Sequence, residues 1–70
     1  MMTSDELRVH FMYLVGAYVT DPATSERLRI LTAQDDIPAK GILAELTPYL
    51  SGAITDTDAK IIKDIAFNFC

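Results

Sequence analysis

Residues 3–19 read TSDELRVHFMYLVGAYV, and this stretch decides the fold. Its start has the pattern of a capping box, in which the Thr3 hydroxyl accepts from the Glu6 N–H and the Glu6 carboxylate accepts from the Thr3 N–H. At about 100° per residue, one narrow stripe of a helix here carries large apolar side chains. They are Leu7, Phe11, Leu14 and Tyr18, with Val15 at the edge. The sequence therefore predicts an amphipathic helix from Ser4 to Val19, with this stripe facing a core.

The opposite side of this predicted helix is also apolar, where charged residues are the rule. It carries Val9, Met12, Tyr13, Gly16 and Val19. A helix with two apolar sides is either central in its fold or shared with a second chain, and Gly16 would let a neighbouring backbone approach closely. A strand is the alternative, because β-forming residues alternate with period two between Val9 and Val19. The capping box and the length of the segment favour the helix.

A second helix is predicted from Pro22 to about Gln34. Asp21 has the chemistry of an N-cap, and Pro22 fits the first helical position because its missing N–H would have no intrahelical partner there. The apolar stripe of this segment is thin and consists chiefly of Leu28 and Leu31. Such a helix is expected to pack on one side only.

A third helix is predicted after Asp35-Asp36-Ile37-Pro38, which repeats the pattern of an acid before a proline. One face of it carries Ile42, Leu43, Leu46, Tyr49 and Leu50. Pro48 lies inside this segment, so we expect a kink or a restart near Thr47, whose hydroxyl could cap a short final turn. Ser51-Gly52 is expected to end the helix.

A fourth helix is predicted from the Thr55-Asp56-Thr57-Asp58 stretch to Cys70. A hydroxyl cap and two acids in the first turn suit the positive end of a helix dipole. The predicted inner face carries Ile61, Ile62, Ile65, Ala66 and Phe69. Phe67 breaks this pattern, because it projects from the otherwise polar outer face.

These segments predict an all-α fold, with residues 1–70 forming a single small domain of three to four short helices in a compact bundle. Ordering a residue costs about 1.5 kcal/mol, so a lone core in a chain of 70 residues is marginal. Half of the chain is hydrophobic, which is a high share for a protein with so much surface. We therefore expect a homo-oligomer, most simply a dimer, or a protein partner that covers the remaining apolar side chains.

The composition excludes several classes of protein. A single cysteine, Cys70, can form neither an internal disulfide nor a Cys-rich zinc site, which favours a reducing cytoplasm. Met1 to Glu6 contains two acids and no base, unlike a signal peptide, and no uncharged run is long enough to cross a bilayer. A net charge of −4 with scattered bases argues against direct nucleic-acid binding and gives no reason to expect a membrane partner.

The sequence offers little catalytic chemistry, and it predicts no enzyme and no catalytic, cofactor-binding or metal-binding residue. His10 is the only imidazole, and its pairing with Glu6 at i,i+4 is a common surface feature. Cys70 lies at the end of a predicted helix, with nothing nearby in sequence to activate its thiol. The acidic pairs Asp35-Asp36 and Asp56/Asp58 lack the alternating ligands, glycine turn and closing Glu of a calcium loop, so helix caps explain them better.

These observations favour a small acidic, non-enzymatic protein-binding module. It would regulate or inhibit a larger protein of unidentified type by covering part of its surface. Phage-encoded antagonists of host systems are similarly small. The predicted protein or self-association interface consists of Val9, Met12, Tyr13, Gly16, Val19 and Phe67. The alternative is an acidic mimic of nucleic acid that occupies a basic groove of a nucleic-acid-binding protein, although six Lys and Arg residues dilute its charge.

Overall fold

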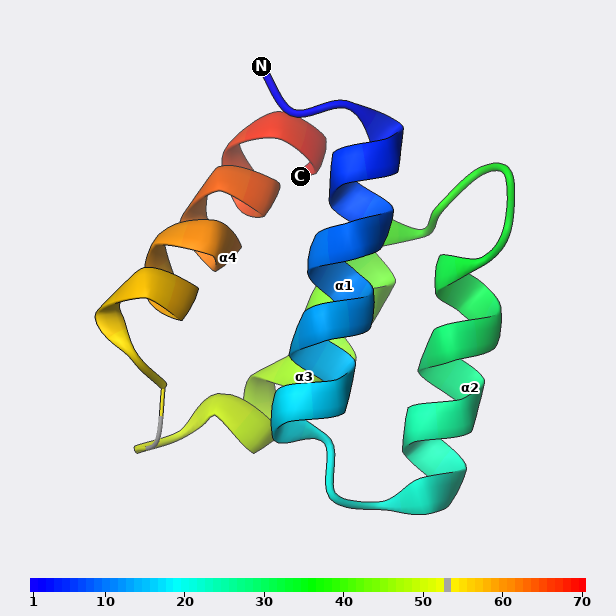
Figure 1. The fold of residues 1–70 in the computed structure, drawn as a ribbon, viewed down its shortest axis with the longest axis vertical. Helices are drawn as coiled ribbons and strands as arrows, with labels where there is room; N and C mark the ends of the chain where they lie inside the picture. Colours follow the sequence, from blue (N-terminus) through cyan, green and yellow to red (C-terminus); the bar gives the residue numbers. More distant parts are fainter. Residues whose placement is uncertain (53) are drawn as a thin grey trace.

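The computed structural model describes residues 1–52 and 54–70, which form four α-helices. They are α1 (Ser4–Tyr18), α2 (Pro22–Thr32), α3 (Ala39–Leu50) and α4 (Asp56–Phe69). In Figure 1, α1 lies in the middle, α2 and α4 flank it, and α3 crosses behind it. Helix α1 contacts each of the other three helices, and both chain ends lie at the end of the bundle where α1 begins. The all-helical fold is confirmed, and the period-two pattern from Val9 to Val19 does not form a strand.

Three of the four helices begin with the caps that their sequences predict. The Thr3 hydroxyl accepts from the Glu6 N–H at 3.1 Å, and Glu6 Oε1 accepts from the Thr3 N–H at 3.0 Å, so the capping box is complete. At α2, the Asp21 carboxylate accepts from the Thr24 N–H at 2.9 Å, and Pro22 opens the helix. At α4, the Thr55 hydroxyl accepts from the Asp58 N–H at 3.1 Å. Each cap needs groups only three residues apart, so the local sequence is sufficient to specify it.

The start of α3 differs from the prediction. Its N-cap is Pro38, and no side chain among the described residues caps it. Asp36 is separated from Pro38 by Ile37, so its carboxylate lies too far back along the chain to accept from the first N–H groups of α3. The acid-before-proline pattern therefore predicts this helix but not its cap.

The end of α3 also differs in part. The helix continues through Pro48 to Leu50 as a single element, without a restart at Thr47. The Thr47 hydroxyl donates to the Leu43 carbonyl oxygen at 2.8 Å instead of capping a new turn. Gly52 follows the helix with φ +78°, a left-handed conformation that favours glycine and confirms the stop at Ser51-Gly52.

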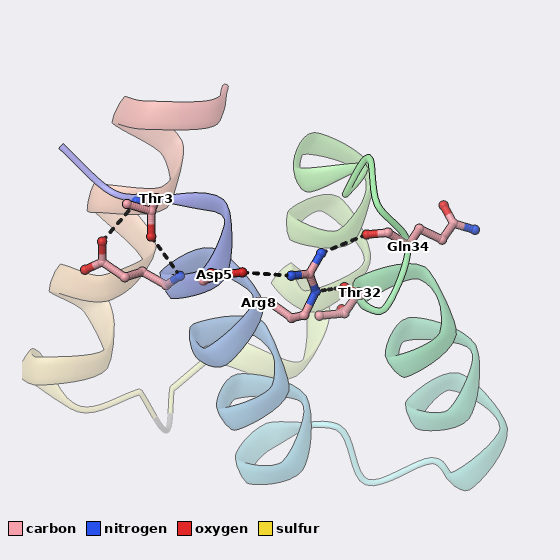
Figure 2. Close-up of polar contacts among 6 residues, drawn as sticks. Thr3, Asp5, Arg8, Thr32 and Gln34 are labelled. Atoms are coloured by element: carbon pink, nitrogen blue, oxygen red, sulfur yellow. Dashed lines mark hydrogen bonds and ion pairs between the residues drawn. The ribbon is translucent and has the colours of Figure 1, made fainter.

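Arg8 joins α1 to the C-terminal end of α2 (Figure 2). Its guanidinium donates from Nε to the Thr32 carbonyl oxygen at 3.1 Å and from Nη2 to the Gln34 carbonyl oxygen at 2.9 Å. Its third nitrogen, Nη1, pairs with Asp5 Oδ1 at 3.3 Å. The Thr32 carbonyl, at the end of α2, lacks an intrahelical donor, so the cation both satisfies it and complements the negative end of the helix dipole, while Gln34 lies just beyond the helix.

The core lies between α1 and the other three helices. Its fully or almost fully buried side chains are Leu7, Phe11, Leu14, Val15, Val19, Leu28, Ala39, Ile42, Leu46 and Ile65. The predicted inward stripe of α1 is confirmed at Leu7, Phe11 and Leu14. The accessible surface is 4470 Å², close to the roughly 4400 Å² expected of a compact monomer of this mass. The single chain is therefore about as compact as a monomer of this mass is expected to be.

Candidate functional site

An exposed apolar surface remains on the outer side of α1 and on α4. The exposed fraction is 68% for Val9, 49% for Tyr13 and 38% for Met12 on α1, and 88% for Phe67 on α4. Gly16 is exposed too, but the Arg29 guanidinium lies 3.6 Å from the position that a Gly16 Cβ would occupy. A side chain of α2, rather than a neighbouring backbone, therefore lies against Gly16.

Val19 differs from the other five residues of the predicted interface, because the structure places it in the core with an exposed fraction of 9%. Helix α1 ends at Tyr18, and the backbone of Val19 is extended, with φ −84° and ψ 108°. The helical rotation of about 100° per residue therefore no longer applies at this position. Its side chain turns inward instead of following the outer side of α1.

Two hollows lie beside this apolar surface, at the end of the bundle where α1 begins and α4 ends. The larger, which we call the α1–α4 hollow, has a volume of about 550 Å³. Its lining residues are Met1, Met2, Glu6, His10, Asp64, Phe67 and Asn68. A smaller hollow of about 310 Å³ is lined by Asp5, Glu6, Val9 and His10. Glu6 and His10 line both hollows, whereas Phe67 lines only the larger one and Val9 only the smaller one.

Hydrogen bonds connect the residues that line the α1–α4 hollow. The Met2 N–H donates to Asn68 Oδ1 at 3.3 Å, which ties the segment before α1 to α4. Asn68 Nδ2 donates to the Asp64 carbonyl oxygen at 2.7 Å. The hydrogen bond from the Thr3 N–H is the main cause that lowers the pKa of Glu6, with further contributions from the Thr3 side chain and from His10. Glu6 is therefore ionised at neutral pH.

A buried carboxylate joins α1 to α4, although its position in the sequence indicated only a helix start. Asp58 has an exposed fraction of 4% and accepts from the Tyr13 hydroxyl at 3.1 and 3.0 Å and from the Tyr18 hydroxyl at 2.5 Å. The hydrogen bond from Tyr18 is the main cause that lowers the pKa of Asp58. Burial raises this pKa, and the hydrogen bonds with Tyr13 and Thr55 lower it further. The hydrogen bond between Tyr13 and Asp58 raises the pKa of Tyr13. The missed signal is the position of Asp58 three and seven residues before Ile61 and Ile65, on the apolar face of α4.

The structure separates the remaining polar candidates. His10 and Glu6 lie together at the hollows, whereas the Cys70 thiol is exposed beyond the last turn of α4. Asp35 and Asp36 are exposed in the segment between α2 and α3. Several acids stand at helix starts, as Asp5, Glu6, Asp21 and Asp56 do. Acids at these positions stabilise the starts of their helices.

Comparison of the chain with models of protein families, with curated proteins and with solved structures finds no match. Among residues 1–52 and 54–70, no group of three His, Cys, Asp or Glu side chains could hold a metal ion. Within the same residues, none of the helices combines the length and the apolar character that a bilayer span requires.

Proposed function

We propose that this chain is a non-enzymatic protein-binding module that regulates or inhibits a larger protein by covering part of its surface. The observation that carries the proposal is Phe67, which is 88% exposed on α4 although the core is closed without it. Val9, Met12 and Tyr13 on α1 extend the apolar area. We place this activity in the cytoplasm, where a lone exposed thiol such as that of Cys70 stays reduced.

The proposal has an energetic basis. Burying a large apolar side chain contributes about 1.5–3 kcal/mol, and interfaces draw most of their affinity from a few aromatic or similar anchors. Phe67 has Lys63 and Asp64 one turn before it, so the fold itself gains nothing from an aromatic side chain there. A partner that buries Phe67 together with Val9 would gain the energy of both.

A homodimer through the same residues is the competing use of this surface. Helix α1 presents Val9, Met12 and Tyr13 to any second copy, and a homodimer through these residues would become more populated as the concentration rises. Light scattering across a concentration series measures it, because a dimer has twice the monomer mass of 7.8 kDa.

The proposal is tested by retention of proteins from a lysate of the cells that encode the chain. The immobilised wild type is compared with Phe67→Glu and with Ile30→Glu, a matched change at an exposed apolar residue of α2. We expect the same protein to be retained by the wild type and by Ile30→Glu, and lost with Phe67→Glu, while circular dichroism shows all three folded. Retention that does not depend on Phe67 would contradict the proposed surface, and retention abolished by about 0.5 M salt would favour the nucleic-acid mimic instead.

A further inference from the structure

We propose that the α1–α4 hollow binds a basic amphipathic helix of the partner, with an apolar side chain in the hollow and Lys or Arg residues beside it. This inference rests on the proposed function, because it specifies the partner of the same surface. About 550 Å³ falls within the roughly 300–1,000 Å³ typical of sites that enclose ligand groups, and Met1, Met2 and Phe67 supply apolar contacts.

The charges around the hollow specify the partner further. The side chains that line the two hollows include the acids Asp5, Glu6 and Asp64, and no Lys or Arg lines either hollow within the described part of the chain. Glu6 stands on α1 and Asp64 on α4, so carboxylates approach a bound segment from both walls. Asp5 is already paired with Arg8. Glu6 and Asp64 are therefore the two acids that a partner's cations would contact.

Besides the hydrogen bond from Thr3, the N-terminal ammonium of Met1, which also lines the hollow, and His10 both act on Glu6 and lower its pKa, so the charge of Glu6 is partly compensated within the fold. Glu6 accepts from the backbone N–H of Thr3, and the carboxylate of Asp64 has no hydrogen-bond or ion-pair partner among residues 1–52 and 54–70. Lys60 and Lys63 are exposed on α4 but lie outside the lining of the hollow. A partner with Lys or Arg next to its apolar anchor would complement this pattern, whereas an acidic segment would be repelled.

The same charges disfavour a second copy as the occupant. A two-fold dimer places the same patch of both chains face to face. Around this hollow it would bring Glu6 and Asp64 of one chain close to Glu6 and Asp64 of the other. A heterologous basic segment is therefore the better fit, and it meets a site whose walls the Met2–Asn68 and Thr3–Glu6 hydrogen bonds already hold.

The test uses two synthetic amphipathic helical peptides of equal length, one of Leu and Lys and one of Leu and Glu. Their binding to the full chain is measured by fluorescence anisotropy. The double variant Glu6→Gln and Asp64→Asn removes two charges at the hollow, and Gln at position 6 keeps the capping box. Asp35→Asn with Asp36→Asn is the matched control, because it removes two charges from the segment between α2 and α3.

We expect the Leu-Lys peptide to bind the wild type and the control with affinities within about twofold, and the hollow variant about tenfold more weakly. An equal loss of affinity for the Leu-Lys peptide in both double variants would overturn the inference. So would binding of the Leu-Glu peptide to the wild type as tight as that of the Leu-Lys peptide, because either result would show that the hollow does not select by charge. A stable dimer at micromolar concentration that Phe67→Glu dissociates would overturn it in favour of a second copy. If the Leu-Lys peptide does not bind but retention from the lysate still depends on Phe67, only the basic helical partner is rejected. If the peptide does not bind and retention does not depend on Phe67 either, the proposed function is rejected as well.

Discussion

Tyr13 and Asp58 are linked by hydrogen bonds from one phenol to both oxygens of the carboxylate, at 3.1 and 3.0 Å, although 45 positions separate them in the sequence. Tyr18 donates to the same carboxylate. The link attaches the first turn of α4 to α1. Because α4 carries Phe67 and one wall of the α1–α4 hollow, this attachment also positions the proposed binding surface.

Replacing Asp58 with Asn should destabilise the fold. The change removes the charge that strengthens the hydrogen bonds from Tyr13 and Tyr18 and leaves an amide facing two hydroxyls. Loss of hydrogen bonds to a buried charged group should lower the melting temperature by roughly 10 °C in a domain of this size. Asp64→Asn, which removes an exposed acid from the same helix, should lower the melting temperature far less. Equal melting temperatures for the two variants in a thermal scan would contradict a stabilising role for Asp58.

Stability should fall in acid, and Asp58 should account for part of the fall. Its pKa in the fold is below the ordinary value of 3.8, so its ionised form stabilises the folded state at neutral pH. That contribution declines as the pH drops through 3.8 and is lost below the lowered pKa. Urea unfolding of the wild type and of Asp58→Asn should therefore show a stability difference that is constant from pH 7 to 5 and narrows towards pH 3. Glu6 and Asp21 also have lowered pKa values, but both proteins contain them, so their effect cancels.

Tyr13→Phe should separate stability from binding. The variant keeps the ring that contributes to the exposed apolar surface but cannot donate to Asp58. We expect the melting temperature to fall by a few degrees, because Tyr18 still donates to the carboxylate. Retention of the partner should stay within about twofold of wild type. A large loss of retention in a folded variant would mean that the Tyr13 hydroxyl itself contacts the partner.

Removing the Arg8 guanidinium should weaken the attachment of α2. Arg8→Met keeps the apolar stem but leaves the Thr32 and Gln34 carbonyl oxygens without their donor, at a cost of about 1–2 kcal/mol in the free energy of unfolding. Arg27→Met removes the exposed pair with Glu45 and should cost at most about 1 kcal/mol. Denaturant titration of both variants measures the difference. A larger loss for Arg27→Met would show that the α2–α3 ion pair, rather than Arg8, holds α2.

The sequence by itself determined the helices and most of their starts. The caps at Thr3, Asp21 and Thr55 join groups three residues apart, and the stripe of Leu7, Phe11 and Leu14 follows from helical periodicity. Such features depend only on the local chain, so they can be predicted before any tertiary contact is known. The exposure of Phe67 was likewise predictable, because it stands on the polar face of α4.

Only the tertiary structure decided which groups meet across the bundle. The burial of Asp58 depends on two tyrosines of another helix, and the partners of Arg8 lie 24 and 26 positions away. Val19 is buried because α1 ends one residue earlier than its periodicity indicates, which redirects a single side chain. The hollow joins the start of α1 to the end of α4, and no local pattern encodes the packing of two helices so far apart in the chain. Periodicity gives the face of a helix on which a residue lies, but the packing of the whole chain decides whether that face is covered.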